Sequence, residues 1–360
     1  MQGKDHAPGL KDVAIAANVS LTTAGNVLRS GAEGQRKHFS EETALRVREA
    51  ARQLGYNPNR AARAMRTRES GVIGFVSVNY SQKWGTVENY TSFPFLVGLS
   101  HALVPSGRHV ALVEIDELEL DRERRLPNAL NECFFDALIV HFGLSPIAQH
   151  LLGEFKIPRI YWDSGIFKKS DCIYRNEKRI SSLLTERLIG QGHRRIVFSA
   201  GLGLKRYLSK KATHFSFGDR HQGYQEAMEA AGLRAGVLTG YHPEELARQI
   251  ASQKATAAVI QGNTDYGVIL QALMILGLRA SEDFAVLACD VETGTINRSG
   301  RLCGATYNRY QVGKVAAEMV MKKLESNEER VPSYEIPIKF SFDHPPLSLP
   351  SGIGDGDLER

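Results

Sequence analysis

Basic side chains are concentrated at one end of the chain. The first 70 of the 360 residues contain 12 Lys and Arg against 7 Asp and Glu, whereas the remaining residues contain 33 of each sign. Guanidinium and ammonium groups attract nucleic-acid phosphates, so a basic unit on a neutral body predicts an electrostatic contact with DNA. An excess of five charges also arises by chance on protein surfaces. Whether these charges contact DNA therefore depends on the structural motif that carries them.

Residue spacings that support catalysis or metal binding do not occur in the sequence. There is no G-x-S-x-G, P-loop, G-x-G-x-x-G or H-E-x-x-H motif. The cysteines are Cys133, Cys172, Cys289 and Cys303, and their scattered spacing is typical of buried free thiols. An enzyme is therefore the disfavoured class, and no cofactor or metal is expected.

The composition is that of a globular protein with two to three compact units. No run of about 18 apolar residues is present, so no membrane-spanning helix is expected. The first residues, Met1 to His6, are polar and lack the apolar core of an export signal, which predicts a cytoplasmic location.

Two short helices joined by a tight corner are expected near the N-terminus. Residues 10–17 place apolar side chains on one helical face, Asn18 suits a left-handed corner, and Ser20 is a good N-cap for a second helix over 21–28. A third helix is expected over 40–55, which ends at a glycine. Together these helices predict a compact all-α module.

Beyond the helical module, the sequence predicts three further segments. An Ala- and Arg-rich segment, residues 58–69, is too short to be a stable helix in isolation and is expected to fold only when something holds it. Residues 70–343 alternate apolar strands with amphipathic helices, which predicts two α/β lobes, each with a doubly wound parallel sheet. Residues 344–360 lack a core-forming pattern and are expected to be disordered, and residues 1–57 form the helical domain. The strands are expected at 72–76, 109–115, 137–141, 159–162, 195–199, 257–260 and 284–288.

The segment Val19–Leu28 reads VSLTTAGNVL and resembles the pattern V-S-x-x-T-V-S-x-V-L of the lactose-repressor (LacI) family of bacterial regulators. The similarity continues through FSEET, LGYNPN and ARAMRT, and again at GQGHRRI, at Arg220 with Gly223-Tyr224, and at residues 286–290. The resemblance therefore covers nearly the whole chain. It implies an N-terminal helix-turn-helix, a hinge helix, and a two-lobed core similar to periplasmic sugar-binding proteins.

For DNA, the resemblance implies that the second helix enters the major groove. Leu21, Thr22 and Asn26 match base-reading positions: Asn26 suits adenine, and Leu21 suits a thymine methyl group. Ser20 and Thr23 match positions that hold phosphates, although Ser20 also serves as a cap.

The same resemblance assigns the hinge segment to the minor groove. Asn59, Ala62 and Met65 match groove-facing positions, and Met65 stands where the family has a wedging Leu. Arg63 and its neighbouring arginines would contact phosphates or the groove. A solvated basic linker is the alternative for this segment.

For a small-molecule effector, Arg220 and Asp290 match positions that grip ligand hydroxyls, and Asp163 matches a third. A charged donor and acceptor across a cleft suit a sugar or polyol, with surface ion pairing as the alternative. Gly262 replaces a hydroxyl-gripping Asn of the family, so the next residue, Asn263, is a candidate in its place. Trp84, in a long loop, is a candidate for stacking on a sugar ring, although a loop Trp is as often a lid or packing residue.

These features predict a homodimeric transcriptional regulator, expected to be a repressor. Its partners would be a pseudo-palindromic operator in double-stranded DNA and a small carbohydrate effector, with no membrane partner. The alternative is a sugar-binding, receptor-like protein with a degenerate DNA-binding head. Gly25 and Met65, which depart from the family pattern, are what suggest it.

Overall fold

The computed structural model describes residues 8–29, 39–57, 69–79, 92–132, 134–141, 145–199, 201, 214–291, 302–326 and 328–341. The chain divides into two compact units, Met1–Ser70 and Gly71–Arg360. Each unit is built around its own hydrophobic core. Among the described residues, no helix has both the length and the apolar character needed to cross a membrane.

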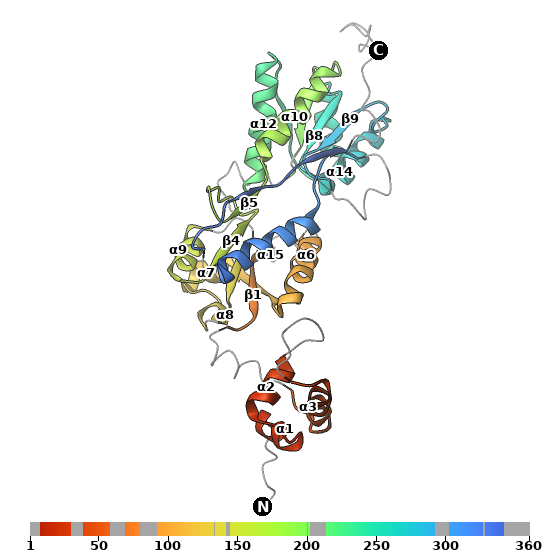
Figure 1. The fold of residues 1–360 in the computed structure, drawn as a ribbon. Helices are drawn as coiled ribbons and strands as arrows, with labels where there is room; N and C mark the ends of the chain where they lie inside the picture. Colours follow the sequence, from red (N-terminus) through yellow and green to blue (C-terminus); the bar gives the residue numbers. More distant parts are fainter. Residues whose placement is uncertain are drawn as a thin grey trace, which may run out of the picture. The chain divides into compact units, whose positions relative to one another are not determined.

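In the described part of the N-terminal unit, three helices pack into one module (Figure 1). Its helices are α1 (Leu10–Ala16), α2 (Leu21–Arg29) and α3 (Glu41–Gln53). The expected corner is confirmed, because Asn18 has a φ of 51° between α1 and α2. The expected cap is confirmed as well, since Ser20 Oγ accepts a hydrogen bond from the Thr23 amide at 3.0 Å. Gly55, with a φ of 64°, lies just after the end of α3.

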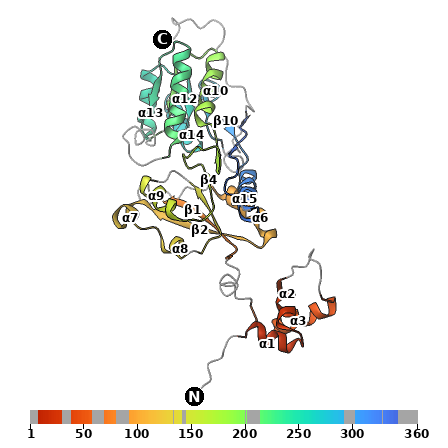
Figure 2. The same cartoon turned by 60° about the vertical axis from the view of Figure 1, so that its left-hand side comes forward.

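The second unit contains two lobes, each with a six-stranded sheet (Figures 1 and 2). In the first lobe the strand order is β11-β5-β4-β3-β1-β2, and every neighbouring pair is parallel. Its strands are β1 (Val72–Asn79), β2 (His109–Asp116), β3 (Ala137–His141), β4 (Arg159–Trp162), β5 (Cys172–Tyr174) and β11 (Tyr334–Glu335). Its helices are α6 (Phe93–Leu103), the 3₁₀ turn η2 (Val104–Ser106), α7 (Glu117–Glu123), α8 (Asn128–Asn131), α9 (Pro146–Glu154) and α15 (Arg309–Glu325).

The second lobe has the strand order β12-β10-β9-β8-β6-β7 and is parallel except for the edge strand β12. Its strands are β6 (Ile196–Ser199), β7 (Gly236–Leu238), β8 (Ala257–Ile260), β9 (Ala285–Ala288), β10 (Cys303–Thr306) and β12 (Lys339–Ser341). Its helices are α10 (Glu177–Gly190), α12 (Ser216–Ala230), α13 (Pro243–Ser252) and α14 (Asn263–Ile275).

Helices cover both faces of each sheet, which explains why the central strands are apolar throughout. In the first lobe, one face packs on α6 and α15 and the other on α7, α8 and α9. In the second lobe, one face packs on α10 and α12 and the other on α13 and α14. The prediction of two doubly wound lobes is therefore confirmed.

The two lobes share the chain in an interleaved way. The polypeptide leaves the first lobe after β5, builds most of the second lobe, and returns as α15 and β11 before ending the described part in β12. Figure 1 shows α15, in blue, beside α6, in orange, although the two helices are far apart in sequence. Three crossings therefore join the lobes, so that their relative position depends on the side chains at the junction.

Glycines permit the close packing of α6 against α15. A methyl group on Gly313 would lie 2.1 Å from the carbonyl oxygen of Phe95, and one on Gly98 would lie 2.0 Å from that of Tyr310. Both contacts involve backbone atoms, which cannot rotate away as the end of a side chain can. The two helices can therefore approach this closely only when both positions lack a Cβ atom.

We expect Gly313→Ala to lower the free energy of unfolding by about 1–3 kcal/mol, because the added methyl group must push the two helices apart. The matched control is Gly153→Ala in α9, where no atom lies within 4 Å of the added methyl group. The control should leave stability unchanged or raise it by up to about 1 kcal/mol. Urea unfolding followed by circular dichroism measures both, and equal stability of the two variants would contradict the packing argument.

Candidate functional site

Helix α2 of the N-terminal unit presents part of its predicted DNA-reading face to solvent. Leu21 is 53% exposed and Thr22 is exposed, whereas Ala24 and Val27 are fully buried against the other two helices. Asn26 is half-buried on the same helix. An exposed apolar side chain next to an exposed hydroxyl suits contact with base edges better than it suits a solvated surface helix.

Ser20 and Thr23 form one hydrogen-bonded pair at the start of α2. The Thr23 amide donates to Ser20 Oγ, and the two hydroxyl oxygens also lie 2.8 Å apart. The predicted hinge residues Asn59, Ala62, Arg63 and Met65 lie outside the described residues, as does Trp84 of the predicted effector site. Asn263 begins α14, and its side chain is likewise outside the description.

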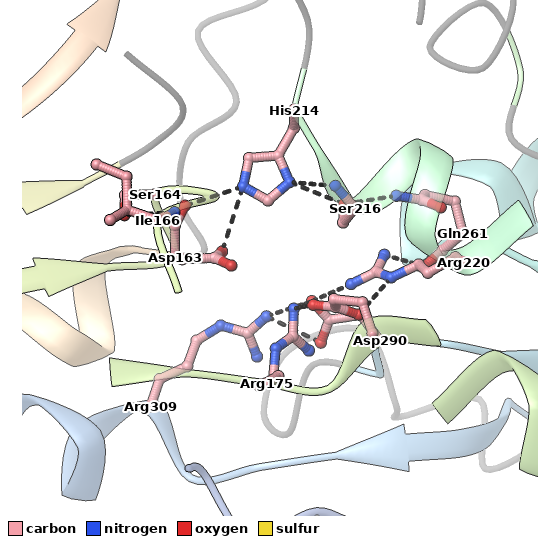
Figure 3. Close-up of polar contacts among 11 residues, drawn as sticks. Asp163, Ser164, Ile166, Arg175, His214, Ser216, Arg220, Gln261, Asp290 and Arg309 are labelled. Atoms are coloured by element: carbon pink, nitrogen blue, oxygen red, sulfur yellow. Dashed lines mark hydrogen bonds and ion pairs between the residues drawn. The ribbon is translucent and has the colours of Figure 1, made fainter. Parts of the chain in front are cut away.

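A buried cluster of charged side chains lies at the junction of the two lobes of the second unit (Figure 3). Its centre is Asp290, the second residue after β9 of the second lobe. Arg309, at the start of α15 in the first lobe, donates to both Asp290 oxygens, at 2.8 and 2.9 Å. This pair therefore joins the two lobes through a charge-assisted contact.

Two further arginines complete the cluster. Arg175, which follows β5, lies 3.4 Å from Asp290 and 2.5 Å from Glu177. Arg220 on α12 lies 2.6 Å from the other oxygen of Glu177 and 3.9 Å from Asp290, and it donates to the backbone carbonyl of Gln261 at 2.8 Å. Every charge in this cluster is thus held by an opposite charge.

The arginines determine the ionisation of Asp290. Burial alone would favour the neutral acid, but Arg175, Arg309 and Arg220 outweigh it and hold the pKa of Asp290 well below its usual range. The ring of Tyr307 contacts two of these cations, with the guanidinium carbons of Arg175 and Arg309 at 4.4 and 4.3 Å from its centre. Burial raises the pKa of Tyr307 to about 12, so this ring is a neutral phenol at physiological pH.

A second row of polar contacts joins the lobes on the other side of the site (Figure 3). His214 Nδ1 accepts from the Ser216 amide at 3.3 Å, so its proton must be on Nε2, which donates to the Asp163 carbonyl at 3.1 Å. The Ser216 hydroxyl lies 2.8 Å from Nδ1 and accepts from Gln261 Nε2 at 3.0 Å. Asp163, which follows β4, is thereby linked to the second lobe.

The structure brings three of the predicted effector residues together. Arg220 and Asp290 lie 3.9 Å apart, and Asp163 is close enough to Arg175 and Arg220 for these cations to help lower its pKa against the effect of burial. Sequence reasoning missed Arg175, Glu177, Arg309, His214 and Gln261. For two of them the available signal was position, since Arg175 and Gln261 each directly follow a strand of a parallel sheet, where ligand sites form.

Comparison with known proteins places this architecture in a family. Residues 9–59 match the family model of bacterial regulatory proteins, lacI family, and residues 185–341 match the periplasmic binding protein-like domain. The chain belongs to the lacI family. Its members are transcriptional regulators rather than enzymes, so this chain is a DNA-binding regulator with a ligand-binding core.

Similar proteins extend along almost the entire chain. The ribose operon repressor of Halalkalibacterium halodurans is 25% identical over 92% of this chain and 94% of its own length. The repressor PurR of Serratia proteamaculans is 26% identical over 96% of this chain and 97% of its own length. The lac repressor dimer bound to operator and the anti-inducer ONPF has a TM-score of 0.74 at 18% identity, covering 93% of this chain and 98% of that one. The family assignment thus applies to both units.

Asp265 lies in α14, close to the charged cluster, and its pKa is far above the ordinary value of an aspartate. Burial raises its pKa to about 7, although Arg220 and the Gln261 backbone act in the opposite direction. Between its ordinary pKa of 3.8 and 7, the folded state keeps a proton that the unfolded state has released. Stability contributed by this group is therefore lost as the pH rises through that window.

We expect Asp265→Asn to be as stable as the wild type at pH 4 and more stable at pH 8, by a few kcal/mol at most, since one pKa unit corresponds to about 1.4 kcal/mol. Asp283→Asn is the matched control, because Arg279 lowers the pKa of the exposed Asp283. That control should be slightly less stable than the wild type at pH 8. Thermal unfolding at the two pH values checks this, and a pH-independent effect of Asp265→Asn would refute the assignment.

Proposed function

We propose that this regulator binds a pseudo-palindromic operator as a homodimer and that a small uncharged polyhydroxylated molecule, a sugar or related polyol, sets its operator affinity from a site between the lobes. The observation that carries the effector proposal is the charge-balanced junction of Arg175, Arg220 and Arg309 with Asp163, Glu177 and Asp290. A carboxylate or phosphate ligand would have to compete for arginines already paired in a buried setting. Hydroxyl groups can instead share these side chains as both donors and acceptors.

The junction also supports a route from effector to operator. Asp290 and Arg309 belong to different lobes, and so do Asp163 and His214. An effector that contacts Asp163, Asp290 and Arg220 would interact differently with each lobe arrangement, which is the condition for shifting an equilibrium between two states.

For DNA, we propose that Leu21, Thr22 and Asn26 read bases and that Ser20 and Thr23 contact phosphates. The exposure of the first two side chains on α2 supports this proposal. The hinge residues Asn59, Ala62, Arg63 and Met65 are proposed to enter the minor groove on the basis of the resemblance alone. The receptor-like alternative receives no support from the family, whose members regulate transcription.

Selection from a random duplex library with the full-length protein tests the central claim. We expect a palindromic site to be enriched, because two copies of α2 would read two half-sites. Asn26→Ala should weaken binding to that site by about 1–3 kcal/mol and relax the preference at one base pair of each half-site. Gln53→Ala, an exposed change on α3, should alter neither. Failure to enrich any palindrome would remove the proposal.

A ligand panel tests the effector class. We expect D-ribose, D-glucose or cellobiose to raise the unfolding temperature, and sugar acids and sugar phosphates of similar size to have no effect. Free purine bases form the competing arm, since both sugars and purines occur as ligands in the family. A shift with a charged sugar, or with a purine alone, would contradict the proposed class.

The contact itself can be tested at Asp290, because Asp290→Asn is isosteric. We expect it to weaken the response to any active sugar about tenfold or more, since it removes a charged acceptor. Asp283→Asn, the same change on the surface of the second lobe, should leave the response unchanged. Calorimetric titration of the two variants measures the difference, and equal affinities would exclude Asp290 as a ligand contact.

A further inference from the structure

Gln261 is a buried side chain at the junction whose described contacts leave its amide oxygen unused. It directly follows β8 and is 8% exposed. Its amide nitrogen donates to Ser216, but no described group donates to its Oε1. A buried amide oxygen without a donor is unfavourable, because it has lost its contact with water and gained no hydrogen bond in exchange.

The orientation of this amide follows from its neighbours. The Ser216 amide donates to His214 Nδ1, so that ring nitrogen is an acceptor and the single proton of the Ser216 hydroxyl is directed to it. Ser216 Oγ can then only accept from Gln261, which fixes the NH₂ group of Gln261 toward Ser216. Oε1 is therefore left as a free acceptor.

The position of Gln261 places this acceptor among the predicted effector contacts. Arg220 donates to the Gln261 backbone carbonyl at 2.8 Å. A Cβ atom on the next residue, Gly262, would lie 3.2 Å from the Asp290 carbonyl oxygen, so the backbone passes directly beside Asp290. Figure 3 shows Gln261 at the end of the polar row that reaches Asp163.

We propose that Gln261 is a specificity-determining effector contact, whose Oε1 accepts a hydrogen bond from one hydroxyl group of the bound polyol. This inference rests on the proposed function. Hydrogen bonds through Ser216 and His214 to the Asp163 carbonyl hold the Gln261 amide in one orientation, so the direction of the acceptor is fixed before a ligand binds. Gln261 then supplies an amide oxygen to the effector site.

The test is calorimetric titration of the full-length protein with D-ribose, D-glucose and cellobiose and with the monodeoxy analogues of whichever probe binds. Gln261→Met keeps the volume and removes the acceptor, and we expect it to bind the probe about tenfold more weakly. One monodeoxy analogue, lacking the hydroxyl that reaches Oε1, should bind the variant and the wild type equally. Gln222→Met, the same change at an exposed site on α12, should bind every probe as the wild type does.

The outcomes separate this inference from the function on which it rests. Unchanged affinity in Gln261→Met overturns the inference, and so does an equal loss for every analogue, which would indicate a packing role. A wild type that binds none of the probes overturns the proposed effector class, and the inference with it. If Gln261→Met fails to unfold cooperatively, Gln261→Ala takes its place, because it removes the same acceptor without adding bulk. Its affinities for the probe and the monodeoxy analogues are then compared with those of the wild type.

Discussion

A carboxylate shared by three buried arginines joins the two lobes of this regulator. Removing charges from water is costly, and only close pairing with opposite charges compensates for it. Asp290 provides that pairing for Arg175, Arg220 and Arg309, with Glu177 as the second anion. Since these side chains come from both lobes and from the crossings between them, the cluster couples the position of one sheet to the other. The rest of the site is organised around this coupling.

The N-terminal unit shows how much local sequence can predict. Its corner at Asn18 and its cap at Ser20 depend on neighbours only a few residues away, and both were predicted. Central strands could be predicted equally well. Residues 137–141 and 257–260 are buried on both faces, and their predicted bounds, like those of 159–162, match the structure. Short edge strands such as β7 and β11 have no such signature and were missed.

The charged junction could be predicted only in part, because it is assembled from distant parts of the chain. Arg220, Asp290 and Asp163 were identified through their resemblance to family positions. Nothing in the sequence indicated that Arg309, at the start of a helix, would meet Asp290, because the helix α15 belongs to the lobe opposite the strand that precedes it. Long-range pairing of this kind is fixed by topology, which local patterns of hydropathy do not encode.

The interleaving of the lobes also has a consequence for how the protein is made. Helix α15 covers the sheet of the first lobe together with α6, yet it is synthesised after nearly all of the second lobe. A ribosome that has completed β1 to β5 has therefore produced a sheet whose apolar face is half covered, and this face stays open until residue 325 has emerged. Exposed apolar surface of this kind invites aggregation, so the nascent first lobe is the stage at which the chain most needs a chaperone.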